Sequence, residues 1–264
     1  MTTFALPAPR LVAADVLRLR RNRSLAVVTG VLTVGAVAVT IAVMELMHVA
    51  SPAKHGPAGG VQNLGHVAFL IAMLGTAAAA IVGSRAGAGD KDAGVYRDLV
   101  VTGRSRVSLY LSRIPAGFAF LFPFVAAAYA LEAVSAVVFA GSNPVPDARL
   151  LALTGLWTVL EVAFFYLLSV AVAALLGSRS YAIGVVLAFR LAITPLVASI
   201  SALGIVRELM PGVAMQALAP AGLGHAARQG PTVPMSIGAV AAVLIVWAVA
   251  AVALAGWRDV TRDA

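Results

Sequence analysis

LLALTGLWTVLEVAFFYLLSVAVAALL, residues 150–176, is an apolar run that contains a single charged side chain, Glu161. It is longer than the roughly 20 residues that a helix needs to cross the hydrocarbon core of a bilayer. A strand of a membrane β-barrel would alternate polar and apolar residues, which this run does not do. A helix satisfies all the backbone hydrogen bonds of such a segment in lipid. The run therefore predicts a membrane-spanning helix.

Five further stretches have the same apolar character. They cover residues 25–47, 67–82, 114–140, 182–203 and 235–256. Of the 264 residues, 61% are hydrophobic and 11% are charged, whereas a soluble domain is about half apolar and a quarter charged. The mean hydropathy is +0.96. We expect an all-α, polytopic membrane protein with six transmembrane helices in one transmembrane domain, residues 1–264.

The composition also excludes several kinds of site. The sequence has no cysteine, so it offers neither a disulfide nor a thiolate metal site, and its four histidines have no ligand-like spacing. We predict no metal or cofactor in this chain. The net charge of +8 comes from arginines beside apolar runs, which favours membrane lipid with anionic headgroups as a partner over nucleic acid.

Basic residues fix the expected orientation. One set of alternate connections carries 14 of the 19 Lys and Arg side chains, the other carries 4, and Arg190 lies inside a span. Because cytoplasmic loops of membrane proteins are enriched in Lys and Arg, both termini are predicted to lie in the cytoplasm.

The N-terminal segment, residues 1–23, precedes the first span. If it is helical, its apolar side chains Val12, Val16 and Leu19 share one face, roughly opposite Arg10, Arg18 and Arg21. The pattern predicts a cytoplasmic interfacial helix in the plane of the membrane. A positively charged flank that only fixes the topology is an equally good interpretation.

The second cytoplasmic connection, residues 85–113, is longer than a tight turn requires and has six basic and three acidic side chains. Val95, Tyr96, Leu99 and Val100 cluster on one side of a short helix expected there, and glycines interrupt the segment. An apolar face ringed by charge suits docking to a second protein. The alternative is a solvated, positively charged loop.

The external connection, residues 204–234, is too apolar for a loop in water, and prolines interrupt it too often for a span. We expect a re-entrant hairpin of two short helices that dips into the outer leaflet, with its broken ends buried against protein. An exposed apolar flap is the alternative.

The order of these parts resembles that of the ABC type-2 permeases, the membrane subunits of ATP-binding-cassette exporters. The sharpest local similarity lies in DAG at residues 92–94, LVVTGRSR at 99–106 and SR at 112–113, followed by WRDV at 257–260 near the C-terminus. The sequence departs from the family pattern at Asp92, where Glu is common, and at Gly103, where proline often stands.

The resemblance implies a coupling helix that docks in a groove of a separate ATPase subunit. The residues that it assigns to this interface are Asp92, Gly94, Val95, Tyr96, Arg97, Leu99, Val100, Arg104 and Arg106. It also implies a second permease copy or homologue, with the fifth and second spans lining the path at a dimer interface, in the cytoplasmic membrane of a bacterial cell. ATP and Mg would be bound by the partner, because Lys54 and Lys91 are not in a Gly-Lys-Ser/Thr loop. The chain itself is therefore expected to be no enzyme.

Two ionisable residues are expected near the middle of the bilayer. Glu161 in the fourth span and Arg190 in the fifth lie at similar depths on antiparallel neighbours, so we predict an intramembrane pair. The pair could hold the bundle together or lie in the translocation path.

Two functions from other classes compete with an exporter subunit. An ATP-independent secondary transporter or channel would use Glu161 and Arg190 as an ion or proton relay, although no inverted repeat is visible between the halves. An intramembrane serine protease would need Ser and His facing each other at depth, and the histidines all lie in the outer connections or at their edges. The substrate does not follow from the sequence.

Overall fold

The computed structural model of the chain describes residues 9–92, 94, 105–227 and 233–261. Within these residues the protein is helical and has no strand. Six of the helices that they form are long and apolar enough to cross a membrane. They are Arg23–Ala50, Val61–Asp90, Arg106–Val138, Ala148–Leu176, Arg179–Ser199 and Ile237–Arg258. The prediction of an all-helical, multi-pass membrane protein is thus confirmed.

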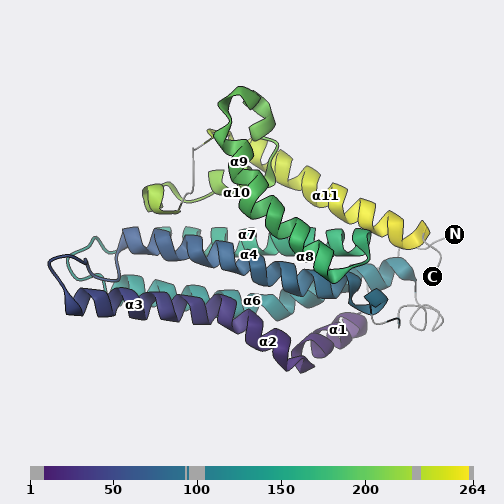
Figure 1. Cartoon of the computed structure of the whole chain (residues 1–264), viewed down its shortest axis with the longest axis horizontal. Helices are drawn as coiled ribbons and strands as arrows, with labels where there is room; N and C mark the ends of the chain where they lie inside the picture. The colour runs from purple at the N-terminus through teal and green to yellow at the C-terminus, as the bar shows by residue number, and fades with distance from the viewer. Residues whose placement is uncertain (1–8, 93, 95–104, 228–232, 262–264) are drawn as a thin grey trace.

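Two of the six, the first and the fifth, are composed of three elements each (Figure 1). The elements are α1 (Pro9–Arg21), α2 (Arg23–Gly30), η1 (Val31–Gly35), α3 (Ala36–Ala50), α4 (Val61–Asp92), α6 (Arg106–Val138), α7 (Ala148–Leu176), α8 (Arg179–Ala188), η2 (Phe189–Ile193), α9 (Thr194–Ser199), η3 (Ser201–Arg207), α10 (Pro211–Ala217), η4 (Ala221–Ala227) and α11 (Ile237–Thr261). The segments η1 and η2 are π-helical, and η3 and η4 are 3₁₀-helical.

Local side chains explain several helix ends. The Asn22 side chain accepts a hydrogen bond from the Leu25 N–H and separates α1 from α2. Ser105 and Asp147 cap the starts of α6 and α7 in the same way, at 3.1 Å from Ser108 N and 2.6 Å from Leu150 N. Gly177, with φ +70°, ends α7 in the left-handed conformation that glycine adopts readily.

Helices α4 and α7 form the centre of the bundle. Within the apolar windows of these spans, 67% of α4 and 61% of α7 is buried inside the chain. Small residues every four positions on α4, at 75, 79, 83 and 87, allow this close approach. A Cβ atom at Gly75 would lie 2.7 Å from Val162 Cγ2, and one at Gly83 would lie 2.6 Å from Ser169 Cβ. Glycine is therefore required at positions 75 and 83 of α4.

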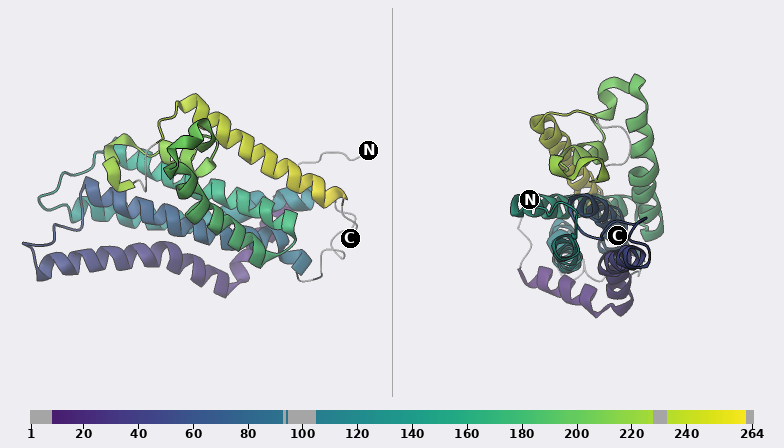
Figure 2. Two further views of the ribbon diagram at one scale, coloured as in Figure 1. Left: turned by 45° about the horizontal axis from the view of Figure 1, so that its top comes forward. Right: turned by 90° about the vertical axis from the view of Figure 1, so that its left-hand side faces the viewer.

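The other spans surround this centre. The first span lies on one side of α4 and α6, whereas α8, α9 and α11 lie on the opposite side (Figures 1 and 2). Only 6% of the apolar window of α11 is buried, against 22% for the first span and 28% for the fifth. These three spans present most of the exposed large hydrophobic side chains, as expected for surfaces that face lipid or another membrane protein.

The second connection is shorter than the sequence indicates. Helix α4 continues through Asp92 and α6 begins at Arg106, so both ends of the segment 85–113 are helical. The small residues AGAG at 86–89 are compatible with a longer α4. Val107, Leu109 and Leu111 extend the apolar pattern of the third span to positions before the expected start at residue 114. Residues 93–105 separate the two helices.

The segment after α9 contains short helices folded back on the bundle. The Trp157 indole donates a 2.8 Å hydrogen bond to the Met215 carbonyl of α10. Trp157 lies nine residues into α7, about 14 Å along its axis from Ala148 at 1.5 Å per residue. In contrast, η3 has no buried residue, and Ile205 is 70% exposed. The segment 204–234 thus combines a buried α10 with an exposed η3.

Both described ends of the chain lie at one end of the molecule. Helix α1, the end of α4, the start of α6 and the end of α11 are grouped there, whereas the connection from α3 to α4 lies at the other end (Figure 1). Helix α1 packs against α6, and its Leu19 is buried. The segment proposed to be interfacial is therefore a helix from Pro9 onward, and its contacts include the bundle itself.

Candidate functional site

Glu161 and Arg190 meet inside the bundle. The Arg190 guanidinium donates two hydrogen bonds to Glu161 Oε1, from Nε at 3.1 Å and from a terminal nitrogen at 2.5 Å. The side chain of Glu161 is fully buried and that of Arg190 is 3% exposed. Each lies about 15 to 20 Å from the start of its own span at 1.5 Å per residue, near the middle of the bilayer thickness.

A π-helical turn carries Arg190. Pro195 has no N–H to donate and its ring crowds the carbonyl of the preceding turn, so the regular α-helical bonding is interrupted before it. The Thr194 N–H instead reaches back to the Phe189 carbonyl, which also accepts from Thr194 Oγ1 at 2.9 Å. Such turns often occur at functional sites. Pro195 is visible in the sequence, but the sequence has no signal for the π turn before it.

One carboxylate oxygen of Glu161 takes no part in the pair with Arg190. Glu161 Oε2 is buried and has no hydrogen-bond partner among the residues described by the structure. On the other face, the Arg190 guanidinium lies over the Phe165 ring, 5.5 Å from its centroid. The arrangement neutralises both charges and still offers one polar atom to a proton or a polar ligand.

Glu132 is a second buried carboxyl. It is 1% exposed, and its Oε2 accepts a 3.3 Å hydrogen bond from the Ser135 hydroxyl on the next turn of α6. The other oxygen, Oε1, has no partner within the described part of the chain. Although Glu132 lies near one end of α6, the structure places its side chain inside the protein.

Most of the residues assigned to an ATPase interface lie outside the described residues. These are Val95, Tyr96, Arg97, Leu99, Val100 and Arg104. Asp92 is the last residue of α4, and Arg106 is the first residue of α6. Gly94 has φ +70° and nothing within 4 Å of the position that a Cβ would take. The structure therefore describes both helices that lead into this interface.

A cluster of charged and polar side chains joins α1 to the ends of α4 and α6. We refer to Asp15, Arg18, Asp90, Ser112 and Arg113 as the α1–α4–α6 polar cluster. Asp90 pairs with Arg18 through Oδ1 and with Arg113 through Oδ2, the latter at 2.9 Å. Arg113 also donates to the Gly87 carbonyl at 3.1 Å, and the Ser112 hydroxyl donates to Asp15 at 2.8 Å.

The polar cluster extends to α7. The Tyr166 hydroxyl donates a 2.6 Å hydrogen bond to the Arg113 carbonyl, and it occupies the space that a side chain at Gly117 would need. Burial is the largest influence on Asp15 and raises the pKa of its carboxyl above the ordinary 3.8, while the Ser112 hydrogen bond acts in the opposite direction. Four helices are therefore joined beside the 93–105 connection.

The sequence alone does not indicate this cluster, because Asp90 and Arg113 both fall within the connection expected over residues 85–113. The apolar residues of the stretch 107–111 were the available signal, since they continue the third span to Arg106 and so place Arg113 in a helix.

No group of three or more His, Asp or Glu side chains that could hold a metal ion occurs in the described ranges. No protein-family model matches the chain, and no curated protein matches it. The class of protein that fold and site define is thus a multi-pass, all-helical membrane protein with an ion pair buried in its bundle.

Proposed function

We propose that this chain is the permease subunit of an ATP-binding-cassette exporter. The observation that carries the proposal is the α1–α4–α6 polar cluster. It ties the amphipathic N-terminal helix to both helices that flank the 93–105 connection, through Asp90 with Arg18 and Arg113. A partner that moves this connection would therefore move α1, α4 and α6 together, as alternating access requires.

The proposed topology follows from charge. The described end of the molecule that groups α1 with the ends of α4 and α11 also has most of the arginines, so we place it in the cytoplasm of a bacterial cell. The opposite end, which includes the connection from α3 to α4, then lies outside. The burial of α10 against α7, at the depth of Trp157, supports a re-entrant hairpin in the outer leaflet.

We propose a dimer of permease subunits in which α8, α9 and α11 supply the contact. These helices have exposed large side chains such as Val185, Leu196 and Val249. The second span was expected to share this role, but α4 is mostly buried within its own chain and has little surface left. We therefore assign the contact to the fifth span and α11 rather than to the second span.

Co-purification of the partner and transport by the complex test the proposal. An ATPase subunit should purify with the affinity-tagged chain from its native membrane. Transport by the reconstituted complex should stop when the phosphate-binding lysine of that ATPase is replaced. Transport that continues on an ion gradient without the ATPase would contradict the proposal.

A secondary transporter or channel is the second candidate, favoured by one specific observation. Glu132 and Glu161 are both buried and each has one carboxyl oxygen without a hydrogen-bond partner among the described residues. Buried carboxyls of this kind serve as proton carriers in transporters. Under this hypothesis Glu132→Gln and Glu161→Gln would each abolish gradient-driven flux.

A further inference from the structure

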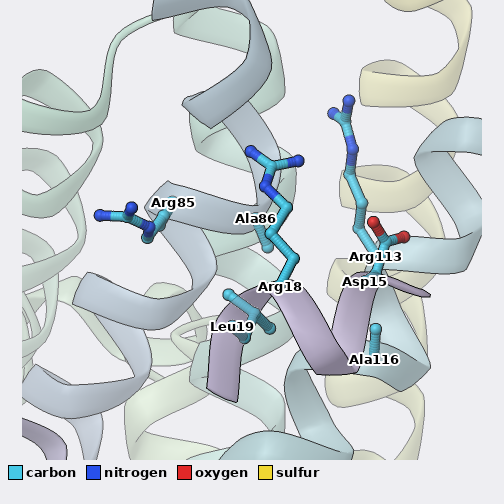
Figure 3. Close-up of a pocket in the computed structure, with 7 residues that line it drawn as sticks. All are labelled: Asp15, Arg18, Leu19, Arg85, Ala86, Arg113 and Ala116. Atoms are coloured by element: carbon cyan, nitrogen blue, oxygen red, sulfur yellow. The ribbon is translucent and has the colours of Figure 1, made fainter. Parts of the chain in front are cut away.

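Three arginines gather around a pocket between α1, α4 and α6. The pocket is lined by Asp15, Arg18, Leu19, Arg85, Ala86, Arg113 and Ala116. In the view of Figure 3, Arg18 lies between Arg85 and Arg113, with Asp15 beside Arg113. The pocket thus brings three cations together with one of the two carboxylates of the polar cluster.

The carboxylates at this place are already engaged by other side chains. Asp90 forms ion pairs with both Arg18 and Arg113, and Asp15 accepts a hydrogen bond from Ser112. Arg85, in contrast, has neither a hydrogen bond nor an ion pair with any residue described here, although its side chain is half-buried. Its charge is not neutralised within this part of the protein.

The neighbours of Arg85 add to the positive charge. A Cβ atom at Gly89 would lie 3.5 Å from a terminal nitrogen of Arg18 and 3.6 Å from Arg85 Cγ, so the two arginines flank this glycine. Arg179, at the start of α8, also lies close enough to act on Arg85 electrostatically. Arg179 and Arg18 both repel the positive charge of Arg85, and an anion between these side chains would reduce the repulsion.

The depth of the site indicates the source of the anion. Arg85 is 24 residues beyond Val61 on α4, about 36 Å along the helix at 1.5 Å per residue. The hydrocarbon core is about 30 Å thick, so Arg85 reaches the headgroup level when Val61 lies at the opposite interface. Leu17 on α1, beside Arg18, is 51% exposed and can contact acyl chains.

We propose that Arg85, with Arg18 beside it, binds the phosphate of an anionic phospholipid between α1 and α4. Arginine suits this ligand because its planar guanidinium donates paired hydrogen bonds to phosphate oxygens. Basic pockets between helices at the membrane surface bind anionic lipid headgroups in this manner. The site requires membrane insertion but neither an ATPase partner nor transport, so it stands apart from the function proposed above.

Lipid affinity of the purified full-length chain tests the site. The protein is placed in nanodiscs of phosphatidylcholine with or without phosphatidylglycerol, and the midpoint of thermal unfolding and the phosphatidylglycerol retained by native mass spectrometry are measured. Phosphatidylglycerol should raise the midpoint of the wild type. Arg85→Gln should lower the apparent affinity for this lipid about tenfold, because it removes a charge-assisted hydrogen bond.

Two controls make the result specific. Arg149→Gln removes an exposed arginine at the far end of the bundle and should retain the wild-type affinity. Arg85→Lys keeps the charge without the paired donors, so an intermediate loss is expected, and it replaces Arg85→Gln if that variant does not fold. Pyrophosphate added to phosphatidylcholine nanodiscs should have no effect.

Three outcomes would overturn the proposal. The first is a wild-type protein that shows no preference for phosphatidylglycerol over phosphatidylcholine. The second is an Arg85→Gln variant that binds phosphatidylglycerol as tightly as the wild type. The third is stabilisation by pyrophosphate that depends on Arg85, without an effect of the lipid, which would assign the pocket to a soluble phosphate ester instead.

Discussion

Glu161 and Arg190 show how two single residues affect the stability of the helical bundle. Each alone would be a bare charge in the middle of the bilayer, at a cost of at least about 2.5 to 3.5 kcal/mol on insertion scales. Together they form two hydrogen bonds and bury both charges. The stability of the bundle therefore depends on keeping or removing both charges at once.

We predict that removing one partner destabilises the protein more than removing both. Glu161→Gln should lower the free energy of unfolding by about 3 to 5 kcal/mol, because Arg190 remains buried and charged. Adding Arg190→Met to this variant should recover part of the loss. Thermal unfolding of Glu161→Gln, of Arg190→Met and of the double variant in one detergent provides the measurement, and additive losses in the double variant would refute the coupling.

Asp15 predicts a pH effect of definite sign. Its pKa is raised by burial, so the folded chain binds this proton more tightly than the unfolded chain. Stability should therefore fall as the pH rises from about the ordinary value of 3.8 through the folded-state pKa, and the loss is complete above it. Asp15→Asn keeps an acceptor for Ser112 and should remove this part of the pH dependence.

Unfolding midpoints measured from pH 4 to pH 8 compare Asp15→Asn with the wild type. Asp147→Asn is the control, because Asn also caps helices well and Asp147 is exposed at the far end of the bundle. Parallel curves for Asp15→Asn and the wild type would show that Asp15 has no such role.

At the level of single residues, only part of the candidate site could be predicted from the sequence. Glu161 and Arg190 could be paired from their depths, because both lie well inside long apolar runs whose ends are clear. Asp90 and Arg113 could not be paired, since the small residues before Asp90 fit a loop as well as a helix. For Arg113 the apolar residues of the stretch 107–111 were the available signal, but they do not identify its partner. Glu132 could not be placed either, because burial near a helix end depends on tertiary contacts.

At the scale of elements, the packing of α4 on α7 is the most demanding feature of the fold. The small residues at positions 75, 79, 83 and 87 of α4 lie against the backbone and side chains of α7. In lipid, helix association rests on such close packing because the apolar surface gains little from leaving the lipid.

We predict that Gly83→Ala is destabilising whereas Gly184→Ala is not. The added methyl group at position 83 would meet Ser169 Cβ at 2.6 Å, and overpacking of this kind costs about 1 to 3 kcal/mol. Gly184 on α8 has nothing within 4 Å of that position, so alanine there should be neutral or stabilise its helix by up to about 1 kcal/mol. Equal unfolding midpoints for both variants would contradict the proposed packing.

Element boundaries show the limit of reasoning from the apolar runs. The second span was expected at residues 67–82, but α4 extends from Val61 to Asp92, because helices continue beyond the hydrocarbon where small and polar residues are tolerated. The fourth span was expected at 150–176 and is observed at Ala148–Leu176, a difference of only two residues. The agreement is good because Asp147 and Gly177 are clear capping signals at the two ends of the helix. The separation of α8, η2 and α9 depended on a proline and on packing, and only the proline is visible in the sequence.

The topology of the whole molecule is open to direct measurement, because the chain contains no cysteine. Ser105→Cys and Gly56→Cys place single thiols at opposite ends of the bundle, before α6 and between α3 and α4. In intact cells a membrane-impermeant maleimide should label Gly56→Cys, and it should label Ser105→Cys only after permeabilisation.

The same pair of variants serves as each other's control for expression and for the integrity of the cells. Labelling of Ser105→Cys from outside would show the opposite orientation and contradict the proposal of a cytoplasmic ATPase partner.

The number of spans follows from composition alone, but their arrangement around α4 and α7 does not. Every apolar run has a similar sequence, and only contacts distinguish a central helix from a peripheral one.

The shallow burial of α11 has a consequence for biogenesis. Helices α4, α6 and α7 are packed together by residues that all precede position 177, and α11 adds little buried surface to them. The ribosome delivers the central helices to the membrane first and the last one when the others can already be packed. We infer that assembly is sequential, with α11 joining a largely finished scaffold.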